Sequence, residues 1–246
     1  MDKVHLSGGR SFSNGVAFAT HRCIVTATLS DGVIACRVRI LPGAALRWIE
    51  FKKRVRVMPR LLNVFVSAWI ASERRRDRLL LAGMVAVICT TGSFHVNNAL
   101  SALAISAILC GAIVVPILIA SGALTAFHAA EHKTVNAYDR LSATDLESIA
   151  AQDRYNPMCG TNLIAPLILA NTAAPFLALY ARLSFVLSLA LLLEIVLWIG
   201  WHNVPVFKTI NRWLQLRYTT SEPTIRQLEV AKTALDAVIA AQDREV

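Results

Sequence analysis

Two histidines one helical turn apart, with a glutamate beside the second, form the pattern in this chain that most clearly indicates chemistry. They are His128, Glu131 and His132. This H-x-x-E-H order is a known zinc-binding arrangement. On an α-helix, positions i and i+4 lie on one face, so both imidazoles can bind one metal ion. The spacing therefore predicts a divalent metal site, with zinc as the expected ion and Glu131 as the general base that takes a proton from water.

A zinc site of this kind needs a third protein ligand, and Cys159 is the predicted one. It lies in the sequence Asn156-Pro-Met-Cys-Gly-Thr161, where proline and glycine let the backbone present the thiol. Glu147 and Glu222 are alternatives for this position. The same residues also have interpretations without a metal. The histidine pair could end a helix at a membrane surface and bind lipid or backbone, and the cysteine could be a buried structural thiol.

The composition indicates a membrane protein with soluble portions. Of the 246 residues, 55% are hydrophobic and 17% are charged, against about 25% charged residues in ordinary soluble domains. This composition excludes disorder for most of the chain. The five cysteines are irregularly spaced and do not form a disulfide framework.

The net charge of +9 is concentrated ahead of the long apolar stretches. Residues 1–78 hold 15 lysines and arginines and 5 acidic residues. The positive-inside rule predicts that this segment is cytoplasmic, and basic residues beside a membrane favour anionic lipid head groups. Nucleic-acid binding is not expected, because no aromatic-interleaved basic patch or known binding motif accompanies the charge.

Four apolar stretches are predicted to cross the membrane as helices. They are residues 79–94, 99–127, 163–180 and 183–201. Four crossings from a cytoplasmic N-terminus return the chain to the cytoplasm and place the loop 128–162 there as well. The expected location is therefore the bacterial inner membrane, with both termini cytoplasmic and the polar segments on one side.

The predicted fold class is an α-helical polytopic membrane protein of about four spans. It has a small N-terminal head that contains a β-hairpin, because Asp31-Gly32 lies between two β-branched runs. An amphipathic C-terminal helix begins near Thr219-Thr-Ser-Glu-Pro223. The predicted order begins with a basic cytoplasmic head (1–60) and an interfacial amphipathic helix (61–78). The transmembrane region (79–201) with its cytoplasmic loop (128–162) and a cytoplasmic C-terminal helix (202–246) follow.

Glu194 lies near the middle of the last predicted span. A carboxylate there costs several kcal/mol unless it is paired, protonated or in contact with water, so it indicates a function such as proton-coupled transport. The alternative is a protonated glutamate that hydrogen-bonds to Asn171, Thr172 or Ser188.

Several blocks of the chain, in this order, resemble the YqhQ-like family of uncharacterised bacterial membrane proteins. The blocks are Gly8-Gly9, Gly15-Val16, His128–Thr134, Asn156–Thr161, Leu214-Gln215, Thr219–Pro223 and Leu228–Ala231. Members are commonly described as metal-dependent enzymes. The resemblance therefore implies a membrane placement and a metal-dependent activity, without naming a substrate.

Compared with the YqhQ-like family, this chain is short and its motifs are divergent. Where the family has His-Pro-Arg-Cys-Gly-Thr, Asn156 and Met158 replace the histidine and the arginine, and Arg10 and Asn14 replace the usual Gln and Glu. If the missing histidine is a ligand in the family, this protein either uses Cys159 instead or lacks the site.

The sequence thus predicts a metal-dependent membrane enzyme, hydrolytic and facing the cytoplasm, that acts on a membrane-protein segment or a lipid head group. The alternative is a non-catalytic scaffold that docks a partner through the basic head and the C-terminal helix. The departures at Asn156 and Arg10 favour this alternative. A proton-coupled transporter is a third class, which rests only on Glu194 and Pro116.

Overall fold

The computed structural model describes residues 4–41, 98–120, 122–200 and 204–243, together with isolated positions between 43 and 96. The chain divides into two compact units. The first takes residues 1–54, 117–161 and 212–246, and the second takes residues 55–116 and 162–211. Each unit has an apolar core of its own.

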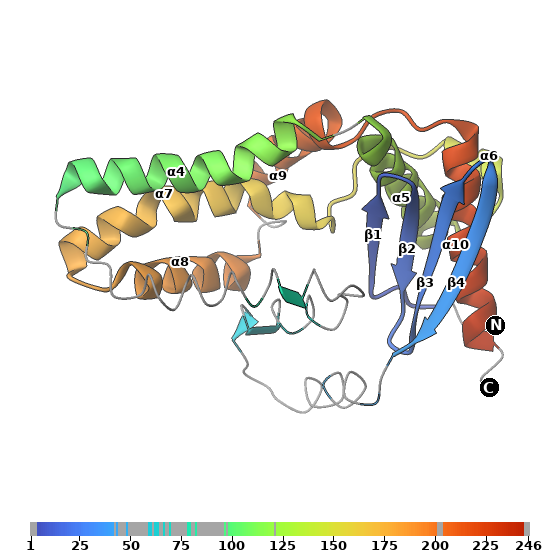
Figure 1. Ribbon diagram of the computed structural model, residues 1–246, viewed down its shortest axis with the longest axis horizontal. Helices are drawn as coiled ribbons and strands as arrows, with labels where there is room; N and C mark the ends of the chain where they lie inside the picture. The colour runs from blue at the N-terminus through green and yellow to red at the C-terminus, as the bar shows by residue number, and fades with distance from the viewer. Residues whose placement is uncertain are drawn as a thin grey trace. The chain divides into compact units, whose positions relative to one another are not determined.

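An antiparallel sheet forms the N-terminal part of the first unit (Figure 1). Its strands lie in chain order, β1 (Gly8–Phe12), β2 (Gly15–Ala19), β3 (Cys23–Ser30) and β4 (Val33–Ile40). Asp31 and Gly32 have φ values of 50° and 76°, which is the positive-φ pair of a type I′ hairpin turn. The hairpin predicted at these two residues is confirmed, as the last strand pair of a larger sheet.

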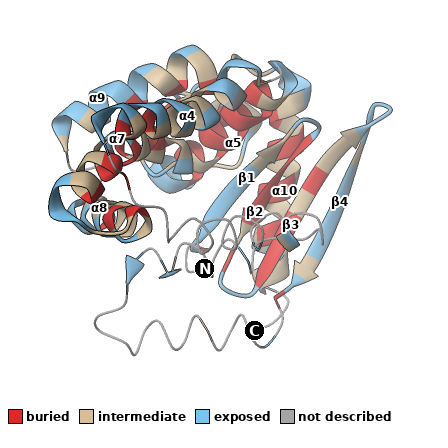
Figure 2. Cartoon of the chain, turned by 60° about the vertical axis from the view of Figure 1, so that its left-hand side comes forward, coloured by how far each residue is buried: buried red, intermediate tan, exposed pale blue. Residues whose placement is uncertain are grey.

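Two long helices pack on this sheet, α5 (Gly122–Leu141) and α10 (Ile225–Asp243), and the short helix α6 (Leu146–Ala150) packs against both. Buried residues concentrate in β2, β3, α5 and α10 (Figure 2). Phe18 from the sheet, Phe127 from α5 and Leu235 from α10 meet in one core. This core fixes α5, which carries the histidine pair.

The second unit consists of apolar helices. They are α4 (Ala99–Leu118), α7 (Ile164–Ala181), preceded by the 3₁₀ turn η1 (Gly160–Leu163), and α8 (Phe185–Ile199). Arg182 ends α7 in the left-handed conformation and the Ser184 hydroxyl caps α8, so the two helices form a tight hairpin. Between α8 and α10 the chain forms α9 (Pro205–Leu214) and a π-helical turn, η2 (Gln215–Thr219).

The prediction of a four-span polytopic protein is wrong. Among the residues that the structure describes, one helix, Gly160–Ala181, is long and apolar enough to cross a membrane. The apolar helices Ala99–Val115 and Phe185–Ile199 are shorter than a span requires. The predicted span 79–94 and the predicted interfacial helix 61–78 lie almost entirely outside the described residues.

The span predicted over residues 99–127 is divided into two helices in the structure. α4 ends at Leu118, and α5 begins at Gly122 as part of the other unit. Phe127 and Ala130 pack in the core with the sheet. Apolar residues that bury themselves against a sheet have the same composition as residues that face lipid, so the continuous apolar run indicated a span that is not there.

Glu194, in α8, accepts a hydrogen bond from another part of the second unit. The main-chain N–H of Arg60 donates to Glu194 Oε1 over 2.7 Å. The Arg60 guanidinium donates to Leu197 O and lies 4.7 Å from the centre of the Trp198 ring. The carboxylate is therefore partnered, as an acidic group on an apolar helix requires.

Candidate metal centre

His128, His132 and Cys159 lie together in the first unit. Their ligand atoms, one from each side chain, are all within 4.8 Å of one another. His128 Nε2 is 3.2 Å from Cys159 Sγ, and the centres of the two imidazole rings are 4.3 Å apart. The histidines come from α5 and the cysteine comes from the segment between α6 and η1. The three predicted ligands thus form one cluster.

Main-chain carbonyl groups hold both imidazoles in place. His128 Nδ1 donates to Thr219 O over 2.8 Å, and His132 Nδ1 donates to Arg154 O over 2.5 Å. A carbonyl oxygen can only accept, so each neutral ring carries its proton on Nδ1 and keeps the lone pair of Nε2 for another partner. Metal-binding histidines are usually oriented by outer hydrogen bonds of this kind.

The neutral form of both rings is favoured. Burial and the neighbouring His128 lower the pKa of His132 to about 3, and burial also lowers the pKa of His128. The side chain of His132 is 1% exposed, and its Nε2 has no hydrogen-bond partner among the described residues. Such a buried, unpartnered atom costs about 1–3 kcal/mol. A metal ion would satisfy it, so the residues fit a divalent cation.

Cys159 completes a donor set typical of zinc. Burial raises the pKa of its thiol to about 11. Its Sγ lies 3.1 Å from Thr161 Oγ1 and accepts the Thr161 N–H over 3.4 Å. The free thiol is therefore protonated at neutral pH, and metal binding must release this proton because the thiolate is the ligand.

Glu131 is buried one position before His132 on α5. Burial raises the pKa of its carboxyl to about 8, and no described residue gives it a hydrogen bond or ion pair that would lower the pKa. Its charge also helps to raise the pKa of Cys159, so the carboxyl lies near the cluster. A carboxyl that titrates near neutral pH can both take and return a proton under cellular conditions.

The backbone of β1 leaves room for this carboxyl. A Cβ added to Gly9 would lie 2.9 Å from Glu131 Cδ and would overlap Oε1. Real Cβ atoms do not approach other atoms so closely, so a side chain at this position would require the Glu131 carboxyl, the far end of a flexible side chain, to move. The Gly8-Gly9 pair is the one signal in the sequence that could have indicated this contact.

A comparison with family models finds one match, to a family described as protein of unknown function (DUF1385), over residues 79–241. The chain belongs to this family. The DUF1385 match covers both histidines, Glu131 and Cys159, whereas the sheet with Gly9 precedes it. No curated protein and no solved structure matched the chain.

In this DUF1385 chain, Asn156 and Gln215 fix the segment that carries Cys159. The Gln215 side chain is fully buried, accepts the Asn156 N–H over 3.0 Å and donates to Asn156 O over 3.1 Å. Asn156 Oδ1 accepts the Met158 N–H over 2.8 Å, which closes a turn just before the cysteine. Asn156, a departure from the YqhQ-like pattern, therefore serves to hold this turn.

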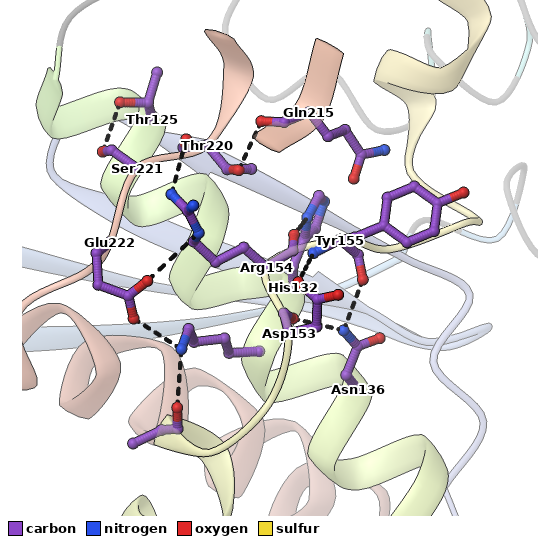
Figure 3. A network of polar contacts seen from close by, with 12 residues as sticks. Thr125, His132, Asn136, Asp153, Arg154, Tyr155, Gln215, Thr220, Ser221 and Glu222 are labelled. Atoms are coloured by element: carbon purple, nitrogen blue, oxygen red, sulfur yellow. Dashed lines mark hydrogen bonds and ion pairs between the residues drawn. The ribbon is translucent and has the colours of Figure 1, made fainter. Parts of the chain in front are cut away.

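The two alternative third ligands lie outside the cluster. Glu147 is an exposed residue of α6. The Glu222 carboxylate forms ion pairs with Lys133 and Arg154 (Figure 3). Among the described residues, the metal cluster therefore contains the two histidines and the cysteine only.

Gln215→Ala should lower the free energy of unfolding by about 2 kcal/mol, because both main-chain groups of Asn156 lose a buried partner. Gln152→Ala is the matched control, since the half-buried Gln152 side chain donates a single hydrogen bond, to Ser148 O. Urea unfolding of the two variants measures the difference. Equal losses would contradict the assigned role of Gln215.

Metal-free protein should lose stability as the pH rises from 6.5 to 8. The pKa of Glu131 is about 8 in the folded chain against an ordinary value of 4.5, so its stabilising protonation is complete below pH 4.5 and is lost on the way to pH 8. The lowered pKa of His132 has the opposite effect at lower pH, since its contribution is present above pH 6.5 and is lost toward pH 3, so the Glu131 loss stands alone only above pH 6.5.

Urea unfolding at pH 6.5 and pH 8 measures this change. We expect the unfolding free energy of the unmodified, chelator-treated protein to fall by about 1 kcal/mol, and that of Glu131→Gln not to fall. Glu229→Gln, which alters a partly exposed carboxylate on α10, is the control and should behave like the unmodified protein. The same pH dependence in all three proteins would exclude the buried carboxyl as its cause.

Proposed function

We propose that this chain is a metal-dependent hydrolase, with a divalent ion, zinc by its donor set, held by His128, His132 and Cys159. The observation that carries the proposal is the convergence of two neutral imidazoles and a thiol around a buried, unpartnered His132 Nε2. When bound, such an ion acts as a Lewis acid that lowers the pKa of water from 15.7 toward 7. The YqhQ-like resemblance supports the same activity.

Residues of the chain orient the two imidazoles and transfer the proton that hydrolysis requires. The carbonyl groups of Thr219 and Arg154 keep both imidazoles in the tautomer that binds through Nε2. A cation near Glu131 favours its carboxylate form. In that form Glu131 accepts a proton from the water that attacks the substrate, and it then returns the proton to the leaving group.

We further propose that the substrate is reached at the cytoplasmic surface of the bacterial inner membrane, where a lipid head group or a membrane-protein segment is available. The apolar helix Gly160–Ala181 follows Cys159 directly in the chain, which supports this placement. The excess of basic residues within 1–78 favours an anionic membrane surface.

The deep burial of the cluster favours a second candidate function, a non-catalytic scaffold with a structural metal ion. His128, Glu131 and His132 are all buried, as is usual for structural sites. Such a protein would hold the metal and show no hydrolysis, whereas the enzyme would show both.

Metal analysis of the purified full chain tests the proposal. We expect one equivalent of zinc per chain in the unmodified protein and in Cys36→Ser, which alters an exposed cysteine. Cys159→Ser should hold much less. Absence of stoichiometric metal in the unmodified protein, even after incubation with zinc, would remove the proposal.

Gly9→Ala should lower the rate of metal-dependent ester hydrolysis by about 100-fold, because a displacement of about 1 Å at a reacting group has that effect. The added methyl group would overlap the Glu131 carboxyl, while the three ligands are untouched. Gly8→Ala is the control, since a Cβ there meets open space. Rates with p-nitrophenyl esters, compared at equal zinc content, measure the effect. Equal rates for the two variants would show that the Gly9 contact is unimportant.

A further inference from the structure

Two cations converge on a single carboxylate beside the metal cluster. Lys133 Nζ lies 2.8 Å from Glu222 Oε1, and Arg154 Nε lies 3.4 Å from Glu222 Oε2 (Figure 3). The Lys133 side chain is 7% exposed and that of Arg154 is 27% exposed, whereas Glu222 is 67% exposed. A buried ammonium group and a partly buried guanidinium group thus share one largely exposed anion, which leaves an excess positive charge.

Both cations have a second contact, with a neutral main-chain group. Lys133 Nζ donates to Ala150 O over 2.8 Å, and Arg154 Nη1 donates to Thr220 O over 3.3 Å. Their positions therefore do not depend on Glu222 alone. Because a buried cation without a counter-ion is unfavourable, the place that the Glu222 carboxylate occupies favours an anion.

This place adjoins the metal cluster through shared residues. Lys133 follows His132 directly on α5, and the carbonyl group of Arg154 accepts the His132 Nδ1–H. Arg154 therefore contributes its backbone to orient a metal ligand and its guanidinium to hold an anion. A substrate group bound here would therefore be held by residues that neighbour, or orient, a ligand of the proposed centre.

We propose that Lys133 and Arg154 form a binding site for a phosphate group of the substrate, and that Glu222 occupies this site until the phosphate replaces it. Each cation takes one oxygen of the Glu222 carboxylate, and two oxygens of a phosphate present the same pair of acceptors with more charge. That the bound group belongs to the substrate rests on the proposed function. The binding of phosphate itself requires only the two cations.

Titration calorimetry with inorganic phosphate on the chelator-treated full chain tests the site. Glu222→Gln removes the internal competitor, so we expect phosphate to bind at least tenfold more tightly than to the unmodified protein. Glu229→Gln, the control, makes the same charge change at a surface pair with Arg226 and should stay within twofold. No gain in Glu222→Gln, or an equal gain in the control, would overturn the proposal.

A second substitution in the Glu222→Gln background identifies the donor. Lys133→Met should abolish the tenfold gain. If that double variant does not fold, Arg154→Gln in the same background gives the same test at a more exposed side chain. A gain that survives the loss of either cation would mean that phosphate binds elsewhere.

Vesicles distinguish the two sources of the phosphate group. If phosphatidic acid vesicles displace bound phosphate from Glu222→Gln and phosphatidylcholine vesicles do not, the phosphate group belongs to a lipid head group. If neither kind of vesicle displaces it, the phosphate group belongs to a soluble compound. Zinc content, measured on the same proteins before chelator treatment, separates this proposal from the hydrolase. Phosphate binding without zinc binding would refute the enzyme only, and zinc binding without the tenfold gain would refute the phosphate site only.

Discussion

His132→Ala is expected to weaken zinc binding by about 1,000-fold, since three ligands share a binding free energy of about 10–16 kcal/mol and each 1.4 kcal/mol is a factor of ten. The Nε2 of this ring has no partner among the described residues, and its Nδ1 donates to Arg154 O. The ring therefore has no evident use other than ligation. Competition with a chromogenic zinc chelator, together with the zinc content of the purified variant, measures the loss.

His5→Ala is the control for this experiment, because His5 is exposed and lies outside the cluster. It should bind zinc as the unmodified protein does. A His132→Ala variant that keeps its affinity would show that the two rings do not share an ion, and the assignment of the centre would fail even if the protein contains zinc.

Glu131→Gln is expected to lower the turnover number of the zinc-loaded protein by about 100- to 10,000-fold, the usual contribution of a general base. Glutamine has nearly the same shape as glutamate, so the buried position should tolerate it, but its amide cannot accept the proton. The initial rate of p-nitrophenyl phosphate hydrolysis measures the effect, with zinc content unchanged.

Glu147→Gln is the matched control, since Glu147 is an exposed carboxylate of α6. It should retain the rate of the unmodified protein. Full activity in Glu131→Gln would remove the general-base role from this residue. Zinc without any hydrolysis in the unmodified protein would favour the scaffold.

The ligand cluster could be predicted from the sequence because its signals are local. The spacing of His128 and His132 depends only on the geometry of one helix, and α5 has that geometry. Cys159 is more distant in the chain, but the proline and glycine near it indicated a backbone that presents the thiol, and the structure has a turn just before it. These residues meet as expected although the fold around them is different from the predicted one.

The fold class could not be predicted because an apolar run does not reveal what covers it. Phe127 was counted as the end of a membrane span, yet it packs with residues of the sheet and α10. The hairpin at Asp31-Gly32 had a specific turn signal and was found, whereas β1 and β2, short and rich in small residues, had none strong enough.

The supports of the centre are also beyond sequence reasoning. Thr219 and Arg154 orient the two imidazoles through main-chain carbonyl groups, which every residue possesses, so no residue type marks them. Asn156 was interpreted as the possible loss of a ligand, and the structure shows it holding a turn with Gln215. Such roles depend on tertiary contacts between segments that are far apart in the chain.

The first unit is assembled from three separate stretches of chain, and this order has a consequence for its biogenesis. The hydrogen bond that orients His128 joins it to Thr219, 91 positions later. A ribosome must therefore release almost the whole chain, including all the apolar helices in between, before this imidazole is fixed. Zinc that arrives during translation would meet a His128 ring that is not yet oriented, so tight loading of the ion should mark finished synthesis, and a chain stalled before Thr219 should bind zinc more weakly.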